Sequence, residues 1–406
     1  MSMTARHTNV FSETEIVAMK QIISTLRASL RNVLSLASQE LHRINGDRNV
    51  LLVLVVAPLL YSLIFGLTYL NGKVYDLPIA VVDMDRSELS RTVIRSLEAN
   101  ESLHVSVVLD NESSLRDLLA REECWAAVVL PPDMERTIKR GNQAQVQMMV
   151  NTSNIIIGNY AQKGIQTVLG SVGAAISMDK MEKKGTPAYA VYTAYSPVEL
   201  QTRVLFNPAT NYALFVVPLL IVLLIHQVVA LGAGMSWAKS MSDGTVIARD
   251  ALHSTILGRS LPYAGAAIFW LGISILGTHT LLGIPFTGSV PMTVLFAILL
   301  ATTVTLVGTL AGVLVRDKLG VVQMLFFTSM PLLLLSGGSW PTDSMPAGVR
   351  AFAGLLPSTY LMNAYRSLSL EDPSFASLLP ALGMLSVLAA VLYIILVMLL
   401  RQRGKA

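Results

Sequence analysis

The stretch YALFVVPLLIVLLIHQVVALGAGM, residues 212–235, carries no acidic or basic side chain except one histidine. It is long enough to cross a bilayer, because a helix needs about 20 predominantly apolar residues to do so and bonds its own backbone polar groups. Five further runs of this kind lie at 50–70, 261–282, 290–315, 319–337 and 378–400. The sequence therefore predicts a polytopic α-helical membrane protein with six transmembrane helices.

The overall composition agrees with a protein whose solvent is largely lipid. Of 406 residues, 53% are hydrophobic and 14% are charged, against roughly a quarter charged in soluble chains. The net charge of +4 includes no dense basic run, so nucleic acid is not an expected partner. The single cysteine, Cys124, excludes an intrachain disulfide, and no cysteine and histidine spacing suits a zinc site.

The lysines and arginines that border the six runs predict the orientation. They precede the first run, join the second to the third and the fourth to the fifth, and follow the sixth, whereas the loop 283–289 has none. Because such residues mark the cytoplasmic side, both termini, with a tail at 401–406, are predicted to be cytoplasmic. The first run follows a long polar segment, so we expect an uncleaved anchor rather than a secretory signal. The lysines and arginines that border the runs are Arg43, Arg48, Lys239, Arg249, Arg259, Arg316, Lys318, Arg401, Arg403 and Lys405.

The segment 71–211 alternates strand-like with helix-like patterns, which predicts an α/β extracytoplasmic domain inserted between helices 1 and 2. Within it, DMDRSE (83–88) has the alternate acids of a calcium loop, but the sixth and twelfth positions hold Glu88 and Ile94 instead of glycine and glutamate. Asp85 or Ser87 is therefore expected to cap the next helix. Expected strands cover 77–85, 104–109, 124–130 and 144–150, and expected helices cover 87–100, 112–122, 131–141 and 154–184.

The N-terminal segment, residues 1–48, has apolar residues at helical spacing from Ser12 to Arg43, with basic residues on the other faces. This pattern predicts an amphipathic cytoplasmic helix. Two interpretations stay open: the helix lies along the membrane interface, or it packs on a partner protein.

The sequence lacks the motifs of the common enzymes. It has no phosphate-binding loop, no nucleophile elbow and no HExxH pair, so we expect no catalytic residue, metal or cofactor in this chain. His226 and Gln227 are the sharpest polar features inside a predicted span. They either line a substrate or proton path or bond one helix to another.

Three segments follow one another in a distinctive order. FNPATNYALFVVPLLIVLL (206–224) places Asn-Pro, an aromatic residue and a proline at the second span, and the next loop contains Gly244-Thr245, Gly258-Arg259 and Pro262-Tyr263. LLLLSGGSWPTDSMP (332–346) is followed by LLPSTYLMNAYR (355–366). In this order they resemble the ABC-2 type transporter permeases. VVDMDRSELS (81–90) is similar to the subgroup with a large extracytoplasmic domain after the first helix, and the resemblance covers the chain from residue 12 onward.

The resemblance implies the permease subunit of an ATP-binding-cassette export system. Such a subunit pairs with a second permease, as a homodimer or a paralogous heterodimer, and with a separate ATP-binding subunit that holds ATP and Mg. The cytoplasmic loop 236–258 would carry a coupling helix, assigned to 238–252, that seats in the ATP-binding subunit. The family's usual Arg-Glu-Arg-Glu run is reduced here to Lys239, Ser240 and Asp243. The implied coupling residues are Lys239, Asp243, Gly244, Thr245, Arg249 and Asp250.

The resemblance also implies cargo and location. Family members mostly export drugs, lipids or other amphipathic compounds across the bacterial cytoplasmic (inner) membrane, and some work with a periplasmic adaptor. Cargo would pass between helices two and five at the dimer seam. Packing or lipid contact is the favoured alternative for each residue of that path, which would comprise Phe215, His226, Gln227, Gln323, Met324, Phe327 and Met330.

The segment 338–377, between the last two runs, is rich in residues that favour turns. Its glycines free the backbone to leave the fifth span, and its tryptophan suits the headgroup level. One proline can begin a short helix, and another interrupts the apolar stretch that follows. We therefore expect a re-entrant extracytoplasmic segment, and the resemblance implies an outer gate. The gate residues are Gly337, Gly338, Trp340, Pro341, Pro346 and Pro357.

A second class of function stays open. A membrane-anchored receptor or surface protein would use the outer α/β domain to bind a ligand and the helices only to hold it. The elaborate loop between helices two and three is more than a simple anchor needs, which favours transport.

Overall fold

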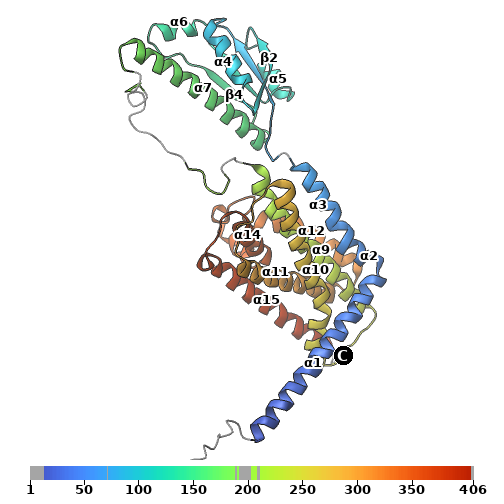
Figure 1. Ribbon diagram of the computed structural model, residues 1–406. Helices are drawn as coiled ribbons and strands as arrows, with labels where there is room; N and C mark the ends of the chain where they lie inside the picture. The colour runs from blue at the N-terminus through green and yellow to red at the C-terminus, as the bar shows by residue number, and fades with distance from the viewer. Residues whose placement is uncertain (1–12, 71, 188–189, 192–202, 208–210, 404–406) are drawn as a thin grey trace, which may run out of the picture. The chain divides into compact units, whose positions relative to one another are not determined.

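The computed structural model describes residues 13–70, 72–187, 190–191, 203–207 and 211–403, with the side chains of the first helix described at 24 and from 27 onward. The chain forms two compact units (Figure 1). The membrane unit comprises 1–72 and 205–406, and the inserted unit comprises 73–204.

Among its described residues, the membrane unit contains six helices with the length and hydropathy to cross a membrane, which confirms the prediction of a polytopic helical membrane protein. The first span is built from α2 (Arg48–Leu51), a π-helical turn η1 (Leu52–Val56) and α3 (Ala57–Thr68). The other five are α9 (Tyr212–Ser242), α10 (Leu252–Leu282), α11 (Val290–Val315), α12 (Lys318–Leu335) and α15 (Phe375–Arg403).

Two of these helices extend much further than the apolar runs predict, whereas α15 exceeds its run by three residues at each end. α9 continues beyond residue 235 to Ser242, and α10 begins at Leu252 rather than 261. Hydropathy marks where the bilayer ends, whereas capping decides where a helix ends. α9 begins where the Asn211 side chain accepts a hydrogen bond from the Ala213 N–H at 2.8 Å. It ends just before Gly244, whose φ of +72° suits glycine.

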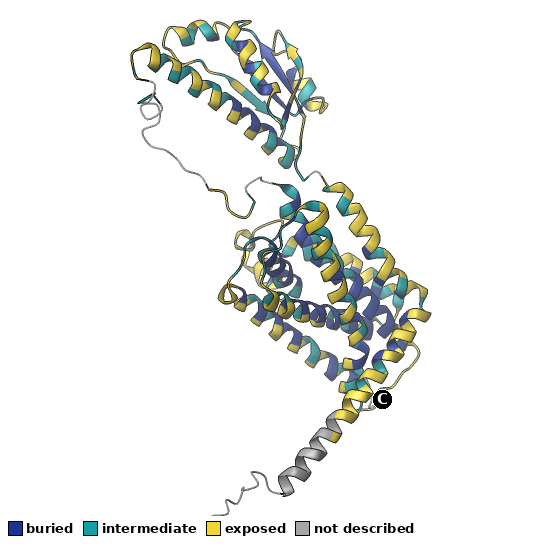
Figure 2. Cartoon of the chain, in the orientation of Figure 1, coloured by how far each residue is buried: buried dark blue, intermediate teal, exposed yellow. Residues whose placement is uncertain are grey.

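The π-helical turn in the first span is fastened to its neighbours. The Trp270 indole of α10 donates a hydrogen bond to the Leu54 carbonyl at 2.8 Å. A Cβ added at Gly232 of α9 would lie 2.8 Å from the Leu54 side chain, so the glycine lets Leu54 pack directly on the α9 backbone. Beyond this point the first span is largely exposed, as the mostly yellow ribbon of α3 shows in Figure 2.

The core of the membrane unit is the crossing of α9 and α11, which are largely dark blue in Figure 2. A Cβ at Gly308 would lie 2.3 Å from the Ala230 carbonyl oxygen, and one at Gly312 would lie 2.3 Å from that of Gly234. Small residues let helix backbones approach this closely in membranes, where dispersion contacts drive packing. The two backbones therefore touch directly, and this contact places α9 at the centre of the unit.

Helix α1 (Glu13–Gly46) lies against α10 of its own chain. Ala37, Glu40 and Ile44 are buried on one face, whereas Leu34 and Leu41 are about half exposed on another. α1 approaches α10 closely at Gly258, where an added Cβ would lie 2.6 Å from the Leu36 Cβ and 2.8 Å from the Val33 carbonyl oxygen. One face of the helix thus packs on its own chain, and the exposed leucines leave both predicted interpretations open, a membrane interface or a partner protein.

Between α12 and α15 the chain forms short helices: η2 (Thr342–Ser344), α13 (Ala347–Ala353) and α14 (Pro357–Leu370). α14 packs on α9, and its Tyr365 ring stacks on Phe296 of α11 with centroids 5.9 Å apart. This segment is part of the packed unit rather than a loose connection.

The inserted unit is an α/β domain, as predicted. Its sheet has the order β2-β1-β3-β4, with β1 parallel to β2 and β3, and β4 antiparallel to β3. Apolar side chains of α4 and α7 pack on one face and those of α5 on the other, so β1 and β3 read as continuous apolar runs. The bounds are β1 Leu77–Asp83, α4 Glu88–Glu98, β2 Leu103–Leu109, α5 Leu115–Ala120, β3 Ala126–Leu130, α6 Met134–Lys139, β4 Gln147–Val150 and α7 Ile155–Lys183.

The DMDRSE stretch caps α4, and the prediction of a cap is confirmed. Ser87 accepts a hydrogen bond from the Ser90 N–H at 3.0 Å. Asp83 accepts from the Arg86 N–H and from the Ser90 hydroxyl, both at 2.8 Å, and Asp85 accepts from the Glu135 N–H at 3.1 Å. Both acids are therefore engaged in holding the strand-to-helix turn.

Candidate coupling site

A buried ion pair joins three helices where α9 runs into the α9–α10 turn (residues 243–251). Glu40 of α1 and Arg259 of α10 lie with Oε2 and Nε 2.8 Å apart and Oε1 and Nη2 3.4 Å apart. The Tyr263 hydroxyl donates to Glu40 Oε1 at 2.9 Å, and the Ser236 hydroxyl of α9 donates to the same oxygen. We call these four side chains the Glu40 cluster. Both carboxylate oxygens are bonded within the protein.

Helical spacing explains why these groups meet. Arg259 and Tyr263 are one turn apart on α10 and therefore share a face. On α1, Arg43 lies one turn after Glu40, with its Nη1 3.5 Å from Glu40 Oε2. The same Nη1 donates to the Ser240 hydroxyl of α9 at 3.5 Å. One carboxylate thus holds two guanidinium groups, each of which also bonds α9.

The planar Arg259 guanidinium makes contacts with α9 both through its face and through its N–H groups. Its carbon lies 4.1 Å from the centre of the Trp237 ring, and Nη2 donates to the Ser236 hydroxyl at 3.1 Å and to the Ser236 carbonyl at 3.3 Å. Arg259 is 4% exposed and Glu40 is 1% exposed. Removing one partner of such a buried pair costs about 3–5 kcal/mol, because the other charge is left uncompensated. The cluster therefore fixes α1 and α10 firmly on α9.

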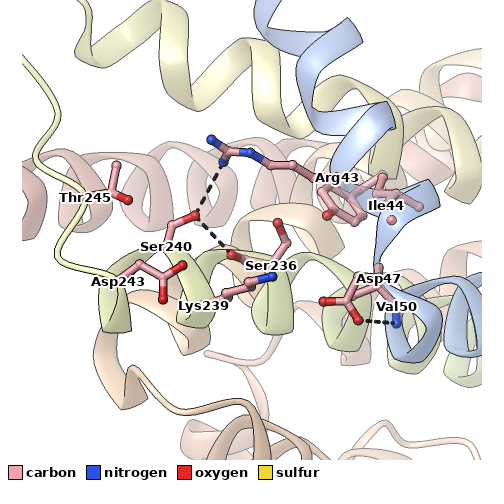
Figure 3. A pocket seen from close by; sticks show the side chains of 11 residues that line it. Arg43, Ile44, Asp47, Val50, Ser236, Lys239, Ser240, Asp243 and Thr245 are labelled. Atoms are coloured by element: carbon pink, nitrogen blue, oxygen red, sulfur yellow. Dashed lines mark hydrogen bonds between the residues drawn. The ribbon is translucent and has the colours of Figure 1, made fainter.

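A cavity of 280 Å³ opens beside the Glu40 cluster, between α1, α9 and the turn. Figure 3 shows Arg43 reaching to Ser240, with Asp243 and Thr245 at one end and Asp47 at the other. Two smaller cavities, of 210 and 260 Å³, also include Thr245 in their walls, so three hollows border the turn. The largest is lined by Arg43, Ile44, Gly46, Asp47, Val50, Ser236, Lys239, Ser240, Asp243, Thr245 and Tyr263.

Asp47 connects the end of α1 to α12. Its carboxylate accepts hydrogen bonds from the Asn49 and Val50 N–H groups and forms an ion pair with Lys318 in the first turn of α12. Burial alone raises the pKa of this carboxyl. The hydrogen bond and charge of Lys318, together with the two N–H groups, outweigh that effect and bring the pKa below its usual value.

The structure brings only part of the predicted coupling set together. Lys239, Asp243 and Thr245 line the 280 Å³ cavity, and Gly244 makes the bend with its positive φ. Arg249 and Asp250, in contrast, are exposed in the second half of the turn and line none of the three cavities described above.

The coupling helix expected at 238–252 does not form as a separate element. Residues up to Ser242 belong to α9, α10 begins at Leu252, and Thr245–Ala248 has no regular secondary structure. The left-handed backbone at Gly244 stops α9. The residues left between the two helices are too few for a stable independent helix, because nucleation is costly.

The predicted substrate-path residues lie in different surroundings within one chain. His226 is 3% exposed on α9, and its Nδ1 and the amide atoms of Gln227 have no hydrogen-bond partner among the described residues. Phe215 is exposed near the start of α9. The other four, Gln323, Met324, Phe327 and Met330, are exposed on α12. None of these seven residues lines the three cavities beside the α9–α10 turn.

Of the predicted gate residues, Gly338 packs directly on α9. Gly337 has a φ of +84°, and a Cβ at Gly338 would lie 2.4 Å from Leu219 of α9. The Asn363 amide of α14 donates to the Ser336 carbonyl at 2.7 Å. Trp340 is 60% exposed, as an interfacial tryptophan would be. Pro341 precedes η2, Pro346 precedes α13 and Pro357 begins α14.

The Glu40 cluster was not found from the sequence. In the sequence, Arg259 and Tyr263 stand out only as parts of the Gly258-Arg259 and Pro262-Tyr263 pairs, and Glu40 does not stand out at all. The available signal was the position of Glu40 on one helix face with Ala37 and Ile44, because an acid on a face of small and apolar residues needs a buried partner.

Comparison with known proteins agrees with this architecture. The profile of the ABC-2 family transporter protein matches residues 48–398. The inner membrane transport permease YhhJ of Escherichia coli K12 is 25% identical over 357 residues, which cover 86% of this chain and 92% of that protein.

Two further relatives are similar over most of their length. The probable multidrug ABC transporter permease YbhS of the same strain is 25% identical, with 84% of this chain and 89% of that protein covered. The linearmycin resistance permease protein LnrN of Bacillus subtilis 168 is 22% identical, with 90% and 98% covered. Since the profile spans six membrane helices and the inserted domain, the chain belongs to the ABC-2 family of transporter permeases.

Proposed function

We propose that this chain is the permease subunit of an ATP-driven exporter of hydrophobic or amphipathic compounds. Membership of the ABC-2 family implies an ATP-binding-cassette partner, and the permease of such a system is not itself the ATPase. Relatives named as a multidrug permease and a linearmycin resistance permease support this class of cargo. Family membership also favours transport over the alternative of an anchored receptor.

The observation that carries the proposal is the rigid attachment of the α9–α10 turn. A soluble motor moves a membrane helix only through a stiff connection. The Glu40 cluster supplies that stiffness, because it fixes three helices together within two turns of the point where α9 ends. The exposed Arg249 and Asp250 would then contact the ATP-binding subunit, which carries ATP and Mg.

We propose that the chain lies in a bacterial inner membrane with both termini in the cytoplasm. The basic residues that border the Glu40 cluster and the α11–α12 junction support this orientation, since such residues concentrate on the cytoplasmic side. The inserted unit is then periplasmic, and its surface is available to a periplasmic adaptor.

We propose that α12 contacts a second permease subunit. Leu319, Gln323, Phe327, Met330 and Leu334 are exposed at spacings of three and four residues, which places them along one helix face. A glutamine amide on a lipid-facing surface lacks partners, whereas across a helix pair it forms hydrogen bonds. Cargo would pass beside this seam, with Met324 and Phe215 near it, whereas His226 and Gln227 stay enclosed.

A charge reversal tests the coupling role. Cells that produce the chain with its ATP-binding subunit should export a fluorescent lipophilic dye, and Arg249→Glu should abolish export. The variant should still fold, because Arg249 is exposed. Arg121→Glu, an exposed change in the inserted unit, is the matched control. Normal export by Arg249→Glu would contradict the coupling role.

Cysteine crosslinking tests the α12 seam. Cys124 is buried and is the chain's single cysteine, so a Cys124→Ala background leaves only introduced thiols. Phe327→Cys should form a disulfide-linked dimer in membranes. Val391→Cys, on an exposed face of α15, should not. Dimer formation by Val391→Cys alone would move the seam to α15.

A further inference from the structure

A groove of 180 Å³ lies between three spans, at the end where α3 and α9 connect to the inserted unit. Its lining contains no charged side chain, and the hydroxyls of Ser62, Ser274 and Thr278 are its only polar side-chain groups. The Thr278 hydroxyl donates to the Ser274 carbonyl of its own helix at 2.7 Å. The groove therefore offers apolar surface and no charge to a ligand.

Two glycines keep the groove open. Gly66 of α3 and Gly277 of α10 both line it, and a Cβ added at either would meet no heavy atom within 4 Å. Glycine within a helix is less favourable than alanine. A side chain would fit at both positions, so close packing does not explain the glycines, and the empty space beside them is the feature that they share.

The rim of the groove continues into the lipid-facing surface. Leu63 and Leu67 on α3 are 59% and 66% exposed, and Leu276 and Leu281 on α10 are 62% and 68% exposed. All four lie on helices with the length and hydropathy of membrane spans. The medium around this part of the protein is therefore hydrocarbon. Since the lining has no charged group and only three hydroxyls, hydrocarbon rather than water is the expected content of the hollow.

Aromatic side chains mark the headgroup level at the same end. The Tyr69 and Tyr212 rings lie 6.0 Å apart, and the Tyr212 and Phe215 rings lie 5.9 Å apart. Tyrosine is enriched at membrane–water interfaces. A chain in the groove thus continues toward a level where a polar headgroup is solvated.

We propose that the groove binds one acyl chain of a membrane phospholipid, held between α3 and α10 with its headgroup at the level of Tyr69 and Tyr212. This site is separate from the α12 seam. It concerns lipid binding by the resting chain, and it stands whether or not the export proposal holds.

Photolabelling of the purified full-length chain, reconstituted in phospholipid bilayers without an ATP-binding subunit, tests this site. The probe is a phosphatidylethanolamine with a diazirine in one acyl chain, and mass spectrometry locates the labelled residues. Labelling should concentrate at 62–66 and 273–282 rather than spread evenly over the lipid-facing helices. Even labelling would overturn the proposal.

Filling the groove supplies the specific test. Gly277→Leu should lower labelling of the groove about tenfold, because exclusion of roughly two methylene groups weakens binding by that factor. Gly272→Leu is the matched control on the same helix, since a Cβ there also meets nothing within 4 Å but the residue does not line the groove. Equal labelling in both variants would overturn the proposal. Should Gly277→Leu fail to fold, Ser274→Leu fills the same space without replacing a glycine.

A second probe distinguishes a phospholipid from an exported compound as the occupant of the groove. A photoreactive lipophilic cation stands in for an exported compound. If it labels the groove while the phospholipid probe does not, the groove holds cargo and the phospholipid proposal is wrong. A phospholipid signal that Gly277→Leu removes supports the proposal, whatever the result of the export assay.

Discussion

The two ends of α9 are built in opposite ways. Near Ser236, three helices meet around a fully bonded ion pair that is almost entirely buried. From Val217 to Leu224, α9 instead shares an open apolar groove with α3 and α10. Displacing the first contact leaves a charge unpaired, whereas apolar contacts are non-directional and allow sliding. α9 is thus held by a buried ion pair beside the α9–α10 turn, whereas its contact with α3 and α10 near the other end is apolar and open.

Breaking the Glu40 cluster should have the largest effect on stability. Glu40→Met leaves the Arg259 charge buried and alone, and should cost about 3–5 kcal/mol. The double variant Glu40→Met/Arg259→Met should recover most of that loss, since replacing both charges by apolar groups of similar size is often neutral. Thermal unfolding of the detergent-purified chain measures both. A single variant as stable as the unchanged chain would show that the pair is not a structural tie.

Two glycine substitutions compare the close contact in the middle of α9 with the open groove. Gly308→Ala forces a methyl group toward the Ala230 carbonyl, 2.3 Å away, and should destabilise the chain by about 1–3 kcal/mol. Gly277→Ala places a methyl group in empty space and should not lower the melting temperature. If both substitutions lower it equally, these two regions do not differ in packing.

Removing the Asp47–Lys318 ion pair should have the smallest effect on stability, because both side chains are partly exposed to solvent. Asp47→Asn keeps a side chain that can cap α2 and removes only the charge, at a cost of no more than about 1 kcal/mol. The folded-state pKa of Asp47 is lowered. Its contribution is therefore present above the usual aspartate value and disappears as the pH falls through and below about 4.

The measurement is the melting-temperature difference between the Asp47→Asn variant and the unchanged chain across this pH range. The gap should close on acidification. A gap that stays constant, or that widens at low pH, would mean that Lys318 does not hold the carboxylate in its charged form.

The elements of the fold could be predicted because their signals are local. Six apolar runs give six spans, and alternating patterns in 77–150 give the four strands of the inserted unit. Helix ends were less predictable. α10 begins nine residues before the apolar run that identified it, because a helix can continue beyond the apolar part of its sequence. The coupling helix was expected from resemblance alone, and Gly244 prevents it.

The site could be predicted only in part because its contacts are distant in sequence. Glu40 and Arg259 are 219 residues apart, and no spacing rule relates them. Lys239 and Asp243 were found because the resemblance placed a functional loop there. The groove could not be predicted for a different reason. Gly66 and Gly277 contribute empty space rather than a side chain, and a lone glycine in an apolar run does not indicate a cavity.

The hydrogen bond from Trp270 to Leu54 divides the first span into a clamped part and a free part. A beam that is fixed at one point bends about that point under a sideways load, and the load on a membrane helix is the lateral pressure of the surrounding lipid. α3 forms one wall of the groove and begins just beyond the clamp. We therefore expect the spacing between α3 and α10 to follow bilayer composition, so that the membrane itself adjusts this part of the permease.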